Sequence, residues 1–294
     1  MQRPFFIVLG LLSLGLVFIA SISNSPFTHS VVVAPTIPNQ MTLAGEDVPM
    51  NDFGVREALD REFIVNTYRH SGTILYLKKA SRWFPVIEPI LKEQGIPDDF
   101  KYLCVIESGM SQVVSPSGAA GFWQFMMKTA PEYGLEVSKT VDERYHIEKA
   151  TIAACQYLKE SYNLLGSWSL AAASYNMGRN GVIMRLEEQG VTDYWDLHLN
   201  SETARYVYRI LAVKEVMTNP EKFGFRMKSS DMYNEYSYTK VKVDSTIDDL
   251  SEFALQNGSN FHEIKTLNPW LIKKNLLVGE GQSYEIYFPN TVVE

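Results

Sequence analysis

The sequence predicts a mainly α-helical protein that ends in a small module of strands and helices. Apolar residues recur at spacings of three and four through most of residues 55–217, which is the period of an amphipathic helix. Residues 236–243 instead alternate polar and apolar side chains, as a half-buried strand does, and residues 284–288 have the pattern of another strand. With 294 residues, of which 46% are hydrophobic, the chain can bury one large core and one small core. We therefore expect two domains after an N-terminal segment.

The first segment, residues 1–23, has the pattern of an export signal. Arg3 and the free amino group precede an uncharged apolar run that extends from Phe5 to Ile22. This run is long for the core of a signal peptide and short for a spanning helix, so a cleaved signal peptide and an N-terminal membrane anchor both remain open. Residues 24–50 hold four prolines and no acid or base before Glu46, which predicts a poorly ordered linker.

Helical patterns follow up to residue 225 and are divided by prolines and glycines. Pro85 fits the opening turn of a helix, Pro89 should bend it, and Gly95 should end it. Asp98 can cap the next helix and Ser201 the last one. Between them, a short helical turn is expected at residues 129–132 and longer helices at residues 148–165, 168–176, 182–188 and 203–217.

Glu107 is the acidic residue that an apolar setting singles out. A helix over residues 98–110 would place Leu103 and Cys104 on the same face as Glu107, the face that should point into the core. Removal of water disfavours the charged carboxylate and raises its pKa, so such an acid can keep a proton to donate near neutral pH. A structural glutamate bound to a Lys, Arg or Tyr is the alternative explanation.

The residues after Glu107 suit a groove that binds sugars. Ser115, Ser117 and Gln124 supply two hydroxyls and an amide for hydrogen bonds, small residues at 118–121 let the backbone approach a ligand, and Phe122 and Trp123 can stack on sugar rings. No acid or base occurs between Ser108 and Lys128.

Four ordered stretches resemble the motifs of the soluble-type lytic murein transglycosylase (SLT) domain. They are Glu107–Ser108, Gly118–Met126, Ala173–Asn176 and Glu202–Val207, and the likeness covers about residues 83–225. It implies a lysozyme-like all-α domain over residues 51–225, including an N-terminal helical extension. It also implies that Glu107 acts on peptidoglycan as acid and then base. The residues implied to position the substrate or Glu107 are Ser108, Ser115, Ser117, Gln124, Tyr175, Asn176 and Tyr206, the last through a hydrogen bond to the glutamate.

The implied reaction is not hydrolysis. In the family the N-acetyl group assists departure and the C6 hydroxyl of the same N-acetylmuramic acid (MurNAc) closes on C1, giving 1,6-anhydroMurNAc ends. Ordinary glycoside hydrolysis uses two carboxylates, and we expect the acids nearest after the motif, Glu132, Glu136, Asp142 and Glu143, to be exposed. Two alternatives stay open: a lysozyme-type muramidase that hydrolyses the same bond, and a non-catalytic peptidoglycan-binding scaffold.

Residues 236–290 resemble a LysM module of degenerate sequence. Two strand patterns enclose helical patterns at residues 248–256 and 262–268, in the order βααβ. The usual Gly-Asp-Thr-Leu start is replaced by Asp244–Ile247. Glycan binding and a purely structural role therefore both remain open for this module.

The remaining reactive residues indicate no metal and no cofactor. The histidines, at positions 29, 70, 146, 198 and 262, lack metal-ligand spacing. Cys104 and Cys155 fall on apolar faces of predicted helices, so we expect two buried thiols, although export would allow a disulfide. A net charge of −7 argues against a nucleic-acid partner. The expected partners are peptidoglycan glycan strands and, through residues 1–23, the membrane, in the periplasm of the bacterial cell envelope.

Overall fold

A computed structural model describes residues 32–290 of the chain. The predicted signal peptide or anchor at residues 1–23 lies outside the described residues. Within residues 32–290, none of the helices combines the length and the apolar composition that crossing a bilayer requires.

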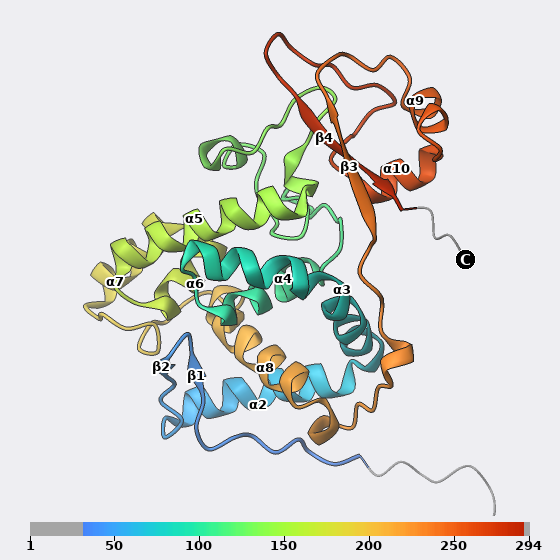
Figure 1. Cartoon of the computed structure of the whole chain (residues 1–294). Helices are drawn as coiled ribbons and strands as arrows, with labels where there is room; N and C mark the ends of the chain where they lie inside the picture. Colours follow the sequence, from blue (N-terminus) through green and yellow to red (C-terminus); the bar gives the residue numbers. More distant parts are fainter. Residues whose placement is uncertain (1–31, 291–294) are drawn as a thin grey trace, which may run out of the picture. The chain divides into compact units, whose positions relative to one another are not determined.

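The described residues are mainly helical, and the predicted fold class is confirmed (Figure 1). A short hairpin, β1 and β2, precedes the helices, and a second pair of strands, β3 and β4, encloses the last two helices. The elements are β1 (Thr42–Leu43), β2 (Glu46–Asp47), α2 (Phe53–Tyr68), α3 (His70–Gln94), α4 (Lys101–Ser108), α5 (Ile147–Leu165), α6 (Trp168–Met177), α7 (Arg179–Gln189), α8 (Tyr206–Thr218), β3 (Tyr238–Val243), α9 (Leu250–Gln256), α10 (Phe261–Leu267) and β4 (Tyr284–Pro289).

The end of the predicted linker is folded, which corrects the expectation of poor order up to residue 50. Ala44 and Gly45 turn the chain with positive φ angles of 53° and 85°. The hairpin inserts Leu43 fully into the core. The Glu46 carboxylate accepts hydrogen bonds from the backbone N–H groups of Trp168 (2.5 Å) and Ser169 (3.0 Å). An acid at the N-terminus of α6 is stabilised by the unpaired N–H groups there.

Helix α3 continues through both of its prolines. Pro85 lies well inside the helix, so the expectation that it would open one is wrong. Tertiary packing explains this difference, because Ile87 and Leu91 on the same helix are fully buried in the core and hold the segment helical across the missing N–H groups. Gly95 ends the helix as predicted, with a φ of +70°.

Both predicted N-caps are wrong. Residues 98–100 form a 3-10 turn, and the Asp98 carboxylate pairs with Lys101 Nζ (2.6 Å) and caps nothing. Before α8, the side-chain oxygen of Asn200, and not Ser201, accepts the N–H groups of Glu202 and Thr203, each at 3.1 Å. Asn200 thus takes the capping role before α8, whereas α4 has no side-chain cap and Lys101 engages the Asp98 carboxylate.

Helix α4 packs against α3 and α8 in the core of the helical domain (Figure 1). Leu103, Cys104 and Val105 are fully buried. The helix ends at Ser108, two residues earlier than predicted, because Gly109 takes the left-handed conformation with a φ of +59°. Glu107 therefore lies in the last turn of a short, buried helix.

The C-terminal module has the predicted order βααβ. Strand β3 pairs with β4 in antiparallel register, with Val241 opposite Ile286. Asp249 caps α9 through its side chain. The core of the module also takes in Val141 from the helical domain, and the backbone of residue 141 forms a bridge to Leu271. Because of this shared core, residues 35–290 belong to one compact unit.

Candidate active site

The Glu107 carboxylate accepts a short hydrogen bond from the phenolic O–H of Tyr206, at the start of α8. The residue is partly exposed. Burial raises its pKa to about 7; the Tyr206 hydrogen bond and the charge of Arg209 act in the opposite direction, and the charge of Glu202 adds to the increase. Glu107 forms no salt bridge within residues 32–290. A carboxyl with this pKa exchanges a proton near neutral pH, as a general acid and base must.

Tyr206 is suited to stay a hydrogen-bond donor. It is almost completely buried, and burial, together with the neighbouring Glu107, raises its pKa well above the ordinary value. Arg209, one turn further along α8, donates to the backbone carbonyl of Ile106 at 2.7 Å. Helix α8 thus contacts the turn of α4 that carries Glu107 through a neutral donor and a cation.

Tyr175 lies beside Glu107 but is engaged with the protein. Its hydroxyl donates to the carbonyl of Trp123 at 2.8 Å, and its ring meets the ring of Tyr157 edge to face at 5.1 Å. Burial raises its pKa well above the ordinary value, and the charge of Glu107 is a second cause. Tyr175 therefore connects the end of α6 to the loop that follows α4.

Ser108 and Gln124 hold the loop that faces the end of α4. Ser108 Oγ donates to the carbonyl of Phe122 at 2.8 Å. The Gln124 amide donates to the carbonyls of Gly121 (2.7 Å) and Val113 (3.1 Å), and the residue itself has a positive φ of 51°. Both side chains therefore hydrogen-bond to the protein backbone, and these bonds hold the loop that forms one wall of the site.

The small residues of this loop have different structural roles. Ser115 Oγ accepts the N–H of Ala119 at 3.0 Å and lies 3.1 Å from Oγ of the exposed Ser117. Gly121 has a φ of +78°, and a Cβ there would lie 1.9 Å from the carbonyl oxygen of Arg144. Only glycine fits at residue 121, because any side chain would overlap that carbonyl.

Asn176 joins the end of α6 to the segment before α8. Its Oδ1 accepts the hydroxyl of Thr203 at 2.8 Å, and its Nδ2 donates to the Glu202 carboxylate at 3.4 Å. Glu202 was not predicted as a site residue, although it opens one of the recognised motifs. Its charge raises the Glu107 pKa, so a second carboxylate acts electrostatically on the candidate acid.

Two acids that we expected to be exposed are buried. Asp142 is 5% exposed and Glu143 3%. Asp142 pairs with Arg144 (2.6 Å), and Arg144 in turn donates to the carbonyls of Gly118 (2.9 Å) and Phe125 (3.2 Å). Burial of both acids follows from ion pairing, since Glu143 pairs with Lys149. The Asp142–Arg144 pair fixes the loop at residues 118–125, a role that the sequence pattern does not indicate.

Cys104 and Cys155 are buried free thiols, as predicted. Burial raises the pKa of Cys155 to about 12 and that of Cys104 also. A thiol reacts as its thiolate, so neither cysteine has the character of a nucleophile near neutral pH.

Comparisons with known proteins agree with both resemblances. Residues 85–197 match the transglycosylase SLT domain, and residues 239–292 match the soluble lytic transglycosylase C-terminal LysM-like domain. The chain is 26% identical over 243 residues to membrane-bound lytic murein transglycosylase D of Escherichia coli strain K12, and equally to that of strain O6:H1. The alignment covers 81% of this chain and 52% of each relative, so the chain spans about half their length. The predicted lysozyme-like SLT domain and LysM-like module are confirmed.

Proposed function

We propose that this chain, which carries a transglycosylase SLT domain followed by a LysM-like domain, is a peptidoglycan lytic transglycosylase. It would cleave the β-1,4 bond between MurNAc and N-acetylglucosamine (GlcNAc) without water. One observation carries the proposal: a half-buried carboxyl, Glu107, is held by the neutral donor Tyr206 and has a pKa of about 7. The relatives in Escherichia coli are named for the same activity, which supports the proposal.

Glu107 first acts as an acid. Its proton passes to the glycosidic oxygen, the bond from that oxygen to C1 of MurNAc breaks, and GlcNAc leaves with a hydroxyl at C4. The N-acetyl carbonyl of MurNAc carries the positive charge that develops at C1. The Glu107 carboxylate then accepts the proton of the C6 hydroxyl as its oxygen bonds to C1, so the enzyme regains its proton. This closure gains from proximity because both groups belong to one sugar.

The remaining site residues would position these groups. We assign Tyr206 to the orientation of Glu107, and Ser108, Gln124 and Tyr175 to the walls that receive the sugar, since their side chains fix the loop at residues 121–124. We likewise assign Ser115, Ser117 and Asn176 to substrate contacts, and residues 51–225 and 236–290 to the catalytic and LysM-like domains.

A muramidase that hydrolyses the same bond is the second candidate, and Glu202 is the observation that favours it. A hydrolase needs a second carboxylate, as nucleophile or as base for water. Glu202 is an exposed acid whose charge reaches Glu107, and Asn176 donates a hydrogen bond to it. A binding scaffold has less support, because it needs no carboxyl with a raised pKa.

Muropeptides released from purified sacculi distinguish these candidates. Mass spectrometry should find ends that are one water lighter than hydrolysed sugar and that resist borohydride reduction. Glu107→Gln should lower release by at least about 100-fold, the lower range of general acid-base catalysis. Mainly reducible ends that carry labelled oxygen from water would establish the hydrolase. Release by Glu107→Gln at the wild-type rate would exclude this mechanism.

We further propose that the protein acts in the periplasm of the bacterial cell envelope, with residues 1–23 as a cleaved signal or as an anchor. The relatives are membrane-bound by name. Peptidoglycan glycan strands would be its partner there.

A further inference from the structure

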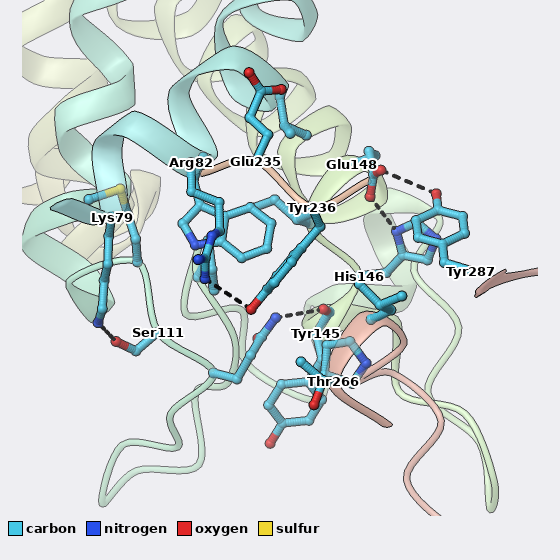
Figure 2. A pocket seen from close by; sticks show the side chains of 18 of the residues that line it. Lys79, Arg82, Ser111, Tyr145, His146, Glu148, Glu235, Tyr236, Thr266 and Tyr287 are labelled. Carbon is cyan, nitrogen blue, oxygen red and sulfur yellow. Dashed lines mark hydrogen bonds and ion pairs between the residues drawn. The ribbon is translucent and has the colours of Figure 1, made fainter. Parts of the chain in front are cut away.

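A cavity of about 360 Å³ lies between the helical domain and the C-terminal module, and Glu107 is not among its lining residues. Its walls come from α3, from the turn after α4, from the start of α5, and from α10 and β4 of the module (Figure 2). This volume falls within the range of small-molecule sites. The two domains thus build a second candidate site together.

Aromatic rings form much of this cavity. Trp83 and Tyr236 lie edge to face with ring centres 5.7 Å apart, and the Trp270 ring stacks on His146, also at 5.7 Å. Tyr145 and Tyr236 are partly exposed, so part of their surface remains open to a ligand. Flat aromatic surfaces beside a few polar atoms suit the apolar faces of a sugar ring.

Trp270 presents a buried donor that lacks an acceptor. The residue is 2% exposed, and its Nε1 has no hydrogen-bond partner among the described residues. A buried N–H without an acceptor costs free energy, and native structures almost always satisfy such groups. Trp270 also lines the cavity, so a ligand bound there lies beside the indole that carries this donor.

The two cationic groups of the cavity are already bound to protein oxygens. Lys79 Nζ donates to the hydroxyl of Ser111 and to the carbonyl of Gly109, and Arg82 donates to the Tyr236 hydroxyl at 2.9 Å (Figure 2). Arg82 also donates to the carbonyl of residue 234 at 2.7 Å. A carboxylate ligand would have to displace these bonds, which argues against an anionic peptide.

The acidic residues of the cavity also argue against an anionic ligand. Glu148 accepts a hydrogen bond from Tyr287 at 3.1 Å and lies 3.2 Å from His146 Nδ1, both drawn in Figure 2. Glu235 adds an exposed carboxylate to the lining. This carboxylate repels anions, so a neutral ligand with hydroxyl and amide groups fits best.

We propose that the cavity binds one neutral N-acetylglucosamine unit of a glycan strand, at an accessory site separate from the reaction centre. The proposal rests on the proposed function for its choice of glycan. Met110 and Ser111 line the cavity and directly follow the turn that ends α4. A strand bound there would contact residues that directly follow the turn carrying Glu107. The module would then contribute to substrate binding through its contact with the helical domain.

The indole N–H signals of the five tryptophans offer a direct test. The full chain with Glu107→Gln is titrated with the neutral GlcNAc tetramer, and nitrogen-proton correlation spectra are recorded. Single Trp→Phe variants assign the signals. The Trp270 signal should move saturably as the sugar binds beside the indole ring. Trp168 and Trp195, which do not line the cavity, should keep their signals.

Thr266 provides a variant that blocks the site. It is exposed and lines the cavity, so Thr266→Tyr should fill space without disturbing a core, and should weaken binding reported by Trp270 about tenfold, equal to about 1.4 kcal/mol. Leu255→Tyr is the matched control, because Leu255 is 69% exposed on α9 and does not line the cavity.

Several outcomes would overturn the proposal: a Trp270 signal that never moves, equal affinity in both Tyr variants, or a shift caused by a free stem peptide and not by the tetramer. Failure of the proposed function would be detected by a different measurement, the analysis of muropeptide ends. In that case sacculi would yield no anhydro ends, whether or not the Trp270 signal moves.

Discussion

At the scale of single residues, Glu107 depends on two opposed effects. Burial raises its pKa to about 7, while the hydrogen bond from Tyr206 favours the charged form and limits the increase. The acid is therefore near half-protonated at neutral pH, where it can both donate and accept a proton. The sequence predicted Glu107 from its apolar helix face. It could not predict burial of Asp142, because a polar stretch gives no sign that Arg144 pairs with it inside the fold.

Tyr206→Phe tests this balance. Loss of the O–H removes a bond to the carboxylate, so the Glu107 pKa should rise further above 7. The acid step needs the protonated form. Wild-type activity should therefore fall as the pH rises through about 7, and in Tyr206→Phe this fall should move to higher pH. Turnover at the optimum should also fall about tenfold or more, because the carboxyl loses its orientation.

The measurement is the pH dependence of anhydro-muropeptide release, with kcat and KM determined separately. Tyr208→Phe is the control, since Tyr208 lies on the same helix and the hydroxyl that contacts Glu107 belongs to Tyr206. If Tyr206→Phe kept the wild-type pH profile, Tyr206 would have no influence on the acid.

At the scale of elements, periodicity predicted which segments are helices, and tertiary contacts decided where they begin. Helices α5 to α8 and both strands of the module lie where the patterns placed them. The hairpin at residues 42–47 was missed because strands of two residues show no alternation; its signal was the Ala44-Gly45 pair. The wrong caps at Asp98 and Ser201 have a local origin, because several polar side chains lie within three residues of each helix start: Lys101 engages the Asp98 carboxylate, and Asn200 accepts the N–H groups in place of Ser201.

The loop at residues 118–125 provides the prediction at this scale. Gly118 and Gly121 both have positive φ, but a Cβ at Gly118 meets no atom within 4 Å, whereas one at Gly121 overlaps the Arg144 carbonyl. Gly118→Ala should cost only the backbone strain, about 1 kcal/mol of the free energy of unfolding. Gly121→Ala should cost roughly 3 kcal/mol or more, because the loop must move away from Arg144.

Urea unfolding and sacculus assays of the two variants make the comparison. Gly121→Ala should also lose activity, since Ser108 and Gln124 bond to the carbonyls of residues 122 and 121. Equal stability of the two variants would mean that the contact with Arg144 does not constrain the loop.

At the scale of the whole molecule, the LysM-like module supports the loop at residues 118–125 through a continuous set of contacts. The N–H of Asp142 donates to the Trp270 carbonyl at 2.9 Å, and Asp142 holds Arg144, which holds the loop. The sequence indicated two domains, but not that Val141 of one completes the core of the other. Sequence patterns report which face of a segment is buried, and not which partner covers it.

Val141→Ser tests this support without touching a sugar-binding residue. Val141 is fully buried in the core of the module, so its replacement leaves a cavity and buries a hydroxyl, which should cost about 2 to 4 kcal/mol. The thermal midpoint should fall, and so should turnover of short soluble glycan chains, because the contact from Trp270 through Asp142 to the loop loosens.

Ile272→Ser is the matched control at the same junction. Its side chain is 38% exposed, and its contact with the helical domain is the backbone bond from its N–H to the Thr140 carbonyl at 3.0 Å, which serine keeps. We expect a change in stability of less than about 0.5 kcal/mol and unchanged turnover. Loss of stability in Val141→Ser with full turnover would show that the module only stabilises the fold. Loss of both stability and turnover in Val141→Ser, with Ile272→Ser unaffected, would show that the module maintains the geometry around Glu107. This role is separate from glycan binding by the module.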